Sequence, residues 1–228
     1  MSARRIAHAL WVATTTAVVM PCPFGLPGAQ ADPCSDVEVV FARATTEPPG
    51  VGQVGQAFVD SLRSQIGSRS LAVYAVNYPA TEDFTNSASA GAVDARAHVQ
   101  STAANCPNTR TVLGGYSQGA LVIDLITALP VSIAGFTPAP MPPDMANHVA
   151  AVAVFGNPAD RFIGAPLAAV SPEYGAKTID LCVPGDPVCS PGGGMTTPTH
   201  DEMFSDAHLS YVKTGMASQG AAFAAGHL

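Results

Sequence analysis

The sequence predicts an α/β fold in which a mostly parallel, five-stranded sheet is covered by helices on both faces. Short, mostly apolar segments of strand length alternate along the chain with longer segments that have the apolar spacing of helices. Since a strand, a helix and a further strand form the unit of a parallel sheet, this alternation favours a parallel sheet between two helical layers. The 228-residue chain contains no repeat or long linker, so a single core of this kind can accommodate it.

The first part of the chain predicts three strands and two helices. DVEVVFAR (36–43) is a short apolar run typical of a buried strand, and GQVGQAFVDSLRSQIG (52–67) has the spacing of an amphipathic helix. LAVYAVNY (71–78) predicts a second strand, SASAGAVDARAHVQSTAANC (87–106) a second helix and RTVLGGY (110–116) a third strand.

The second part of the chain completes the sheet and its covering. SQGALVIDLITAL (117–129) predicts a helix, and HVAAVAVFG (148–156) and KTIDLC (177–182) predict the fourth and fifth strands. SDAHLSYVKTGMASQGAAFAAG (205–226) predicts the last helix. Catalytic groups in such sheets gather at the carboxyl ends of the strands, so the loops that follow the strands are where a site is expected.

The first 31 residues have the layout of a secretory signal peptide. Arg4 and Arg5 precede an apolar run over residues 6–20, and the small-residue triplet Ala-Gln-Ala occupies 29–31. A transmembrane anchor is the alternative, but the apolar run is short for a bilayer and prolines follow it at once. We therefore expect a secreted protein whose single mature domain spans residues 32–228.

The cysteines fit an exported protein. Removal of the leader would take Cys22 with it and leave four: Cys34, Cys106, Cys182 and Cys189. An even number suggests two disulfides, although four cysteines permit three pairings; proximity favours Cys182 with Cys189, which leaves Cys34 with Cys106. Metal binding is the competing interpretation, but the sequence has no C-x-x-C pair or histidine cluster at ligand spacing, so no metal is expected.

The net charge of the chain limits the kinds of molecule that it is expected to bind. Ten Lys and Arg residues against 17 Asp and Glu residues make the chain acidic, with a net charge of −7, so nucleic acid is not an expected partner. Only 12% of the residues are charged and 47% are apolar. This composition suits a compact secreted domain with a partly apolar surface.

Ser117 lies between Gly115 and Gly119 at the point where a predicted strand gives way to a helix. In a nucleophile elbow the serine occupies a sharp strand-to-helix turn, and residues two before and two after it must lack a side chain. The G-x-S-x-G pattern alone is weak, and a helix-capping serine beside packing glycines is the alternative. The elbow interpretation predicts Ser117 as a nucleophile and the amide of Gln118 as one oxyanion donor, because a helix N-terminus favours developing negative charge.

A serine nucleophile requires a base and a carboxylate that orients the base. Hydrolases of this topology supply them in the order Ser, Asp, His. Asp186 follows the fifth predicted strand and lies between Gly185 and Pro187, within the narrow cysteine loop. The alternative is an ordinary turn aspartate, since Gly-Asp-Pro is good turn chemistry.

Four histidines come into question as the base. His98 precedes the serine and His148 precedes Asp186, so both break the expected order. His200 and His208 both satisfy it, and the residues alone leave the two open.

Several motifs together resemble the cutinase family, especially the cutinase-like proteins of mycobacteria and their relatives. The resemblance is carried by the first cysteine pair and by ARATTE (42–47), GYSQG (115–119), CVPGDPVC (182–189) and HLSY (208–211), and it covers nearly the whole expected mature chain. It implies a small, lidless α/β-hydrolase that cleaves carboxylic esters without a cofactor. It also implies that Ser117 is the nucleophile, Asp186 the orienting acid and His208, rather than His200, the base.

The resemblance further implies an oxyanion hole. In the family, the amide after the nucleophile acts with a hydroxyl residue and its amide in a loop after the first strand. Here that loop is residues 43–47, which places Thr45 beside Gln118 as a donor, with Ala44 where the family's motif has glycine.

The expected function is therefore hydrolysis of lipid or polyester-type esters through an acyl-enzyme. We expect a monomer that makes peripheral contact with a lipid or cell-wall surface. Two alternatives stay open: an acyltransferase that uses the same triad, and a cell-surface binding protein whose triad is vestigial. The sequence does not rank cutin polyester, triacylglycerol, phospholipid and cell-wall ester as substrates.

Overall fold

The computed structural model describes residues 34–228 except 133, 165, 167–168, 170 and 192–195. The expected signal peptide and Cys22 lie outside the described residues, so cleavage near residue 32 stays a prediction. Among the described residues, no helix is both long enough and apolar enough to span a membrane.

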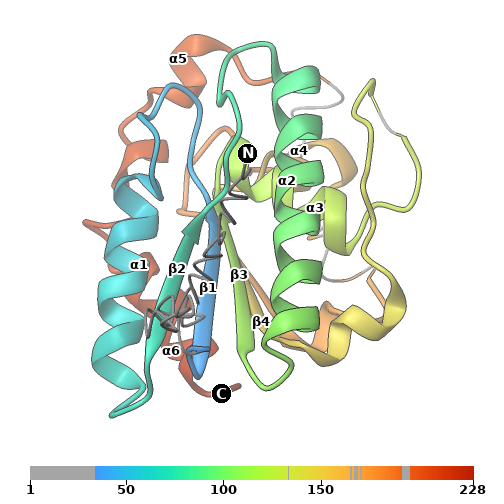
Figure 1. Cartoon of the computed structure of the whole chain (residues 1–228). Helices are drawn as coiled ribbons and strands as arrows, with labels where there is room; N and C mark the ends of the chain where they lie inside the picture. Colours follow the sequence, from blue (N-terminus) through green and yellow to red (C-terminus); the bar gives the residue numbers. More distant parts are fainter. Residues whose placement is uncertain (1–33, 133, 165, 167–168, 170, 192–195) are drawn as a thin grey trace, which may run out of the picture. The chain divides into compact units, whose positions relative to one another are not determined.

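Five strands form one sheet in the order β2-β1-β3-β4-β5 (Figure 1). The four pairings between neighbouring strands are all parallel, as the alternation of strand and helix patterns predicts. The central strands are apolar and buried along almost their whole length, which is typical of a sheet covered on both faces. The strands are β1 (Val37–Ala42), β2 (Leu71–Ala75), β3 (Arg110–Tyr116), β4 (Val149–Phe155) and β5 (Thr178–Leu181).

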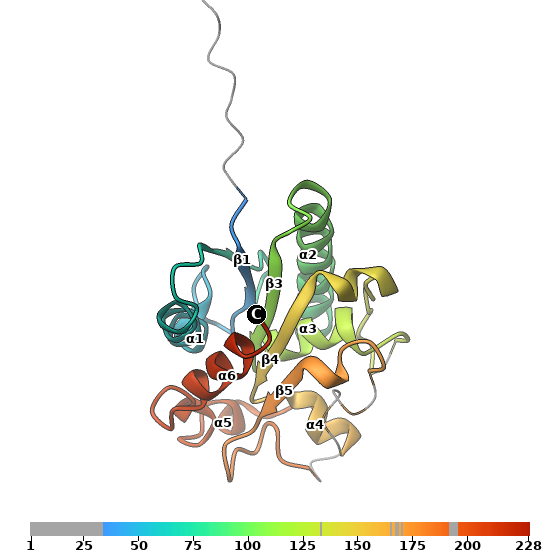
Figure 2. The ribbon, with the colours of Figure 1, turned by 90° about the horizontal axis from the view of Figure 1, so that it is seen from below.

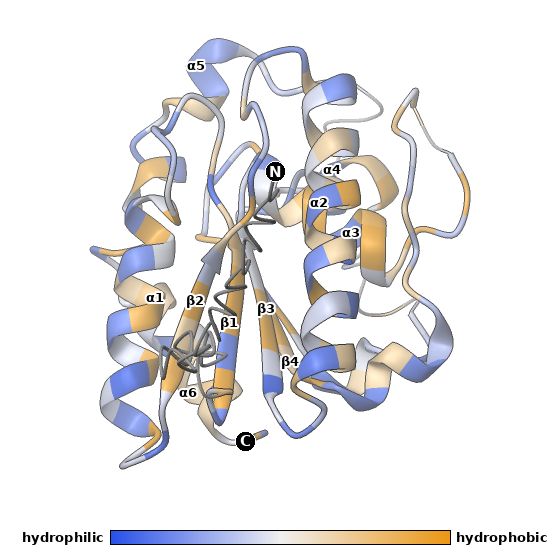
Figure 3. Ribbon diagram, in the orientation of Figure 1, coloured by the Kyte–Doolittle hydropathy of each residue, from blue (hydrophilic) through white to orange (hydrophobic). Residues whose placement is uncertain are grey.

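Helices cover both faces of this sheet (Figures 1 and 2). The helices α1 (Gly52–Gln65) and α6 (Met216–Ala225) pack on one face, and α2 (Phe84–Asn105) and α3 (Gln118–Thr127) pack on the other. Figure 3 shows largely hydrophobic strands, while hydrophilic residues lie on outer turns of α1 and α2. The structure therefore has the parallel sheet covered by helices on both faces that the sequence predicts.

The two cores follow from the alternation of side chains along the strands. In β1, Val40 faces the α2 and α3 layer, whereas Phe41 faces the α1 and α6 layer. Phe41 packs there against Phe58 of α1 and Phe155 of β4, with ring centroids 5.9 and 6.4 Å from its own. These buried aromatic contacts fix the sheet against its helices.

The prediction of one continuous helix over 205–226 is wrong. The structure has a 3₁₀ turn, η4 (His208–Ser210), then further turns, and α6 begins only at Met216. Gly215, with φ 77°, adopts a left-handed conformation at the start of α6 and separates the two parts. His208 therefore lies in a short turn and does not begin the last helix.

Among the described residues, the structure has four further short elements that the sequence analysis did not assign. The most informative is α5 (His200–Met203), which begins with a capping box between Thr199 and Glu202. The others are η1 (Pro143–Asn147), α4 (Pro158–Ile163) and η3 (Gly175–Lys177).

Both disulfides favoured by the spacing are present. Cys34 is bonded to Cys106, which ties the segment before β1 to the C-terminal end of α2. Cys182 is bonded to Cys189, which closes the loop after β5.

Candidate active site

The candidate site lies where the strand order changes direction. From β1 the chain passes through α1 to β2 on one side, whereas β3 pairs with β1 on the other side. The loops that leave the carboxyl ends of β1 and β3 therefore diverge, and such a switch point is the usual place for a site in a parallel sheet. Ser117 follows β3 directly, and Thr45 lies in the loop after β1.

Ser117 occupies the sharp turn between β3 and α3. Its backbone dihedrals, φ 56° and ψ −119°, are strained for a residue that has a side chain. A Cβ atom on Gly115 would lie 2.2 Å from the carbonyl oxygen of Gly119. One on Gly119 would lie 2.0 Å from the carbonyl oxygen of Ala42, at the end of β1. The turn can therefore close only because both positions lack a side chain, as the G-x-S-x-G pattern predicts.

The structure brings Ser117, His208 and Asp186 into one hydrogen-bonded chain. His208 Nε2 lies 2.9 Å from Ser117 Oγ, and His208 Nδ1 lies 2.8 Å from Asp186 Oδ2. Asp186 is fully buried and His208 is 2% exposed, so water has little access to their contact. The side chain of His200 is 69% exposed, and its ring lies against Phe204. Of the two candidate bases, it is therefore His208 that lies beside Ser117.

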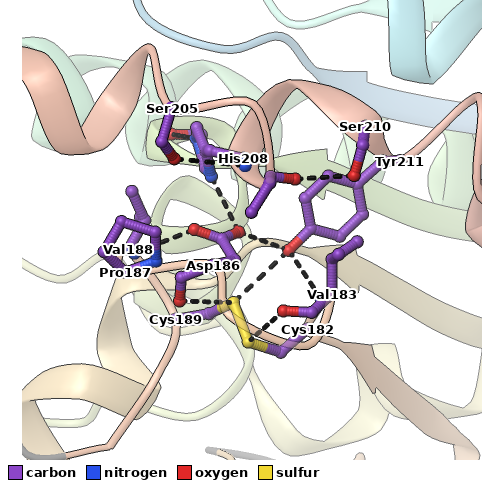
Figure 4. Close-up of polar contacts among 12 residues, drawn as sticks. Cys182, Val183, Asp186, Pro187, Val188, Cys189, Ser205, His208, Ser210 and Tyr211 are labelled. Carbon is purple, nitrogen blue, oxygen red and sulfur yellow. Dashed lines mark hydrogen bonds and ion pairs between the residues drawn. A yellow bond between two sulfur atoms is a disulfide. The ribbon is translucent and has the colours of Figure 1, made fainter.

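Asp186 is held by its own loop and by a tyrosine (Figure 4). The Cys182–Cys189 disulfide closes the loop, and the N–H of Val188 donates to Asp186 Oδ1 at 2.9 Å. The hydroxyl of Tyr211 donates to Asp186 Oδ2 at 2.6 Å. Burial, and then the charge of Asp186, raises the pKa of Tyr211 well above its usual value, so the hydroxyl stays protonated and donates.

The sequence analysis missed Tyr211 and two further residues, Tyr116 and Gly156, that surround His208. The hydroxyl of Tyr116 donates to the carbonyl oxygen of His208. Gly156 has φ 56°, and a Cβ atom there would lie only 2.9 Å from His208 Cε1, so the glycine makes room for the imidazole. One signal could have identified Tyr211: it lies three positions after His208, and residues at that spacing face the same side of a helical turn.

The two expected oxyanion donors lie close together. Gln118 Nε2 is 3.4 Å from Thr45 Oγ1 and also donates to the carbonyl oxygen of Thr81 at 2.8 Å, while Gln118 Oε1 accepts from the hydroxyl of Ser87 at 2.7 Å. The Gln118 side chain thus joins the loop after β1 to α2 and the loop before it. Within the ranges that the structure describes, the amide N–H groups of Thr45 and Gln118 donate to no other group. Both amides are therefore available to an oxygen atom that reacts beside Ser117.

The loop after β1 is braced by the buried Arg43 and the half-buried Glu47. Arg43 Nε donates to the carbonyl oxygen of Glu47 at 2.7 Å, and Arg43 Nη2 donates to that of Tyr78 at 2.8 Å. The carboxylate of Glu47 accepts from the N–H of Ala44 at 2.8 Å. The left-handed conformation in this loop falls on Thr46, with φ 64°, and not on Ala44. Alanine in place of the family's glycine is thus compatible with the backbone of the loop.

Two cavities meet at Ser117 and Thr45. The first, of about 20 Å³, is narrow, and most of its lining is apolar: Phe84, Leu121, Phe136, Phe162, Val188 and Met203. The second is an open groove of about 570 Å³ that also includes His208. No group of three or more His, Cys, Asp or Glu side chains in the described part of the chain is arranged to hold a metal ion.

Three carboxyl groups lie on or beside α4, the helix whose Pro158 and Phe162 line the narrow cavity: Asp124 and Asp160 are buried and Asp180 is half-buried. The side-chain amide of Asn157 donates to Asp124 Oδ2 at 2.7 Å and to Asp180 Oδ2 at 3.0 Å. Burial raises the pKa of Asp124 well above its usual value. Burial, together with the charge of Asp180 and a hydrogen bond to it, raises the pKa of Asp160 to about 8. Burial also raises the pKa of Asp180, to about 6.

Known proteins share this sequence and this fold. Residues 33–228 match the family model described as Cutinase. The chain is 52% identical over 222 residues to the carboxylesterase Culp1 of Mycobacterium tuberculosis, covering 95% of this chain and 93% of that protein. It is 48% identical over 227 residues to the phospholipase Culp4 of the same organism, covering 100% and 93%.

Among solved structures, the cutinase of Trichoderma reesei in complex with a C11Y4 phosphonate inhibitor is 34% identical, with a TM-score of 0.62. The likeness covers 85% of this chain and 76% of that one. The chain therefore belongs to the cutinase family, whose members hydrolyse carboxylic esters.

Proposed function

We propose that this chain is a secreted serine esterase that hydrolyses lipid or polyester-type esters through a triad of Ser117, His208 and Asp186. The observation that carries the proposal is the unbroken hydrogen-bonded chain from Ser117 Oγ to Asp186, which meets an apolar cavity at its serine end. A binding protein with a vestigial site would have no need to keep a strained serine between two sterically required glycines.

In the proposed reaction, Ser117 Oγ attacks the ester carbonyl carbon while His208 Nε2 accepts the hydroxyl proton. Asp186 stabilises the resulting imidazolium. The carbonyl oxygen becomes an oxyanion and accepts hydrogen bonds from the amides of Gln118 and Thr45 and from the Thr45 hydroxyl. His208 then gives its proton to the departing alcohol oxygen. In the second half, His208 takes a proton from water, the resulting hydroxide attacks the acyl carbon, and the proton returns to Ser117 as the acid leaves.

The relatives support an ester or lipid substrate. One is a carboxylesterase, a second a phospholipase, and the Trichoderma cutinase is complexed with a phosphonate inhibitor. The apolar lining of the narrow cavity is suited to the hydrocarbon part of an acyl group. An acyltransferase would use the same residues with a different acceptor, so products formed in the presence of an added alcohol separate the two activities.

Secretion is part of the proposal. The layout of residues 1–31 and the two disulfides of the domain both fit an oxidising compartment. We also propose that the protein acts as a monomer, which its elution volume in size-exclusion chromatography checks.

Ser117→Ala tests the nucleophile. Hydrolysis of a chromogenic short-chain ester should fall by about a thousandfold or more, and labelling by a serine-directed phosphonate should disappear while the melting temperature is kept. Activity above about a tenth of wild type would contradict the proposed role of Ser117, since deletion of a catalytic nucleophile lowers the turnover rate by several powers of ten.

The histidine pair supplies a matched control. His208→Ala should reduce turnover as severely as the serine change, whereas His200→Ala should alter it by less than about tenfold because that side chain takes no part in proton transfer. The reverse pattern would place the base at His200, the first residue of α5.

A further inference from the structure

One buried arginine joins three of the segments that enclose the narrow cavity. Arg161 lies on α4, is 7% exposed and directly precedes Phe162, a lining residue of that cavity. Its Nη1 donates to the carbonyl oxygen of Pro187 at 3.0 Å and to Glu202 Oε1 at 2.9 Å. Its Nη2 donates to the hydroxyl of Thr196 at 3.3 Å. The guanidinium thus joins α4 to the loop after β5 and to α5 with the residues before it.

All three segments contribute to the lining of the narrow cavity. Arg161 itself is not part of that lining. The contributions from α4, from the loop after β5 and from α5 with the residues before it are, in that order, Pro158 and Phe162; Val188; and Thr197, Pro198 and Met203. The width of the cavity therefore depends on how far α4 stands from the other two segments.

The chemistry of the arginine suits this position. A guanidinium is planar and carries donors on three nitrogens, so it can bond to several segments at once. A buried cation needs an anionic partner, and Glu202 supplies one. Glu202 is fixed in turn, because its Oε2 accepts from the N–H of Thr199 at 2.8 Å in the capping box of α5. The contact between Arg161 and Glu202 therefore connects two elements whose own geometry is fixed.

The cavity is small for an acyl chain. About 10–15 Å³ is the space of one water-sized group, so a cavity of about 20 Å³ accommodates one or two carbon groups beyond the ester carbonyl. A longer chain can enter only if part of the lining moves. Movement of α4 away from the loop after β5 or from α5 would stretch the hydrogen bonds of Arg161, so these bonds oppose the entry of a longer chain.

We propose that Arg161 is a positioning residue that sets the width of the narrow cavity, and with it the length of acyl chain that the enzyme selects. It acts through Pro187 and Glu202 and touches no reacting atom. The inference rests on the proposed esterase function. It adds a determinant of specificity that lies outside both the triad and the lining of the cavity.

An acyl series tests the proposal with the alcohol held constant. Wild type and variants hydrolyse p-nitrophenyl acetate and p-nitrophenyl hexanoate, both as monomers in solution, and released nitrophenolate is measured. Arg161→Met occupies similar space without donors, so the hexanoate-to-acetate ratio of kcat/KM should rise by about fivefold or more. The kcat for the acetate should fall by less than about threefold, because the disulfide and Tyr211 still hold Asp186.

Further variants show whether the hydrogen bonds carry the effect. Arg161→Lys keeps the charge but only one donor nitrogen, so its ratio should lie between those of wild type and Arg161→Met. Glu202→Gln should raise the ratio in the wild-type background, but by less than about twofold in the Arg161→Met background, where its partner is already gone. Arg63→Met is the matched control. Arg63 pairs with Asp60 on the outside of α1, where both side chains are more than half exposed, so the ratio should not change.

The outcomes separate this inference from the proposed function. A ratio in Arg161→Met within about twofold of wild type, an equal rise in Arg63→Met, or a full effect of Glu202→Gln without Arg161 would overturn the positioning role. If Arg161→Met does not fold, the same criteria apply to Arg161→Lys. In each of these cases, hydrolysis that depends on Ser117 would leave the esterase function standing. If neither ester is hydrolysed, or if hydrolysis does not depend on Ser117, both the proposed function and the inference fail.

Discussion

Tyr211→Phe removes one oxygen atom from a fully buried side chain that touches the proposed triad but not the substrate cavities. That hydroxyl donates to Asp186 Oδ2 at 2.6 Å and accepts from the N–H of Val183 at 3.1 Å. The same carboxylate oxygen is the partner of His208 Nδ1. Tyr211 is thus a positioning residue, and its loss should affect both folding stability and turnover.

The two lost hydrogen bonds set the size of the effect. A hydrogen bond to a charged group contributes about 1.5–3 kcal/mol, and a buried N–H left without a partner costs about 1–3 kcal/mol. Allowing for partial relaxation, we expect the free energy of unfolding to fall by about 2–4 kcal/mol and the Tm by roughly 5–15 °C. Asp186 keeps its bonds to Val188 and His208, so kcat should fall by only about tenfold, which is about 1.4 kcal/mol of barrier.

Tyr116→Phe is the matched control. Its hydroxyl makes one hydrogen bond, to the neutral carbonyl oxygen of His208, so its loss should lower stability by only about 1 kcal/mol. Melting temperatures and steady-state kinetics on a short-chain ester, measured well below both Tm values, give the comparison. For Tyr211→Phe, kcat should fall while KM changes by less than about threefold. A lowered Tm with wild-type kcat would refute the positioning role, and a wild-type Tm would refute the energetic reasoning.

Three further predictions concern the surroundings of the site. The folded pKa of Asp160, about 8, is above the usual unfolded value of about 4, so its contribution to stability is complete below pH 4 and is lost as the pH rises to 8. Asp160→Asn should therefore lessen the fall in Tm between pH 5 and pH 8.5 by several degrees; an equal or steeper fall would contradict the assignment. Replacing Cys182 and Cys189 by serine should reduce ester turnover more than Tm, because the loop that they close is short and its entropic contribution to stability is only about 2–3 kcal/mol. Replacing Cys34 and Cys106, which close a much longer loop, should reduce Tm more than turnover. A narrow-pair variant with normal turnover would count against this account of the loop. Ala44→Gly should change kcat by less than about threefold, since Ala44 does not have the left-handed conformation that favours glycine; a tenfold gain in ester kinetics would show that the loop is strained by alanine.

The order of strands and helices could be predicted from the sequence because buried strands are encoded locally. β4, with the sequence VAAVAVF, is buried at each position, and no amphipathic helix has such a pattern. The sharp turn at Ser117 could also be predicted from the sequence. Backbone atoms within a few residues of Ser117, and at the neighbouring end of β1, leave no room for side chains at positions 115 and 119, so glycine is required there. The last helix was predicted too long because local periodicity continues through Gly215, where the left-handed backbone interrupts it.

The choice of the base shows the limit of local information. His200 and His208 both satisfy the chain order, and only the resemblance to a family favoured the second. In the structure, the loop after β5 and the turns before α6 meet, which brings Asp186 Oδ2 to 2.8 Å from His208 Nδ1 and buries both side chains. His200 begins the short helix α5, and its side chain is 69% exposed.

The sequence by itself determined which segments are buried, where the glycine-flanked turn at Ser117 lies and in what order Ser117, Asp186 and His208 follow, because these depend on periodicity, glycine and neighbouring residues. Only the tertiary structure decided which buried side chains meet. Tyr211 contacts Asp186 across 25 positions, and Ser87 holds Gln118 across 31. The apolar groove beside His208 likewise combines the loop after β1 with the turns before α6. Such contacts depend on the order of strands in the sheet, and no local pattern in the chain specifies that order.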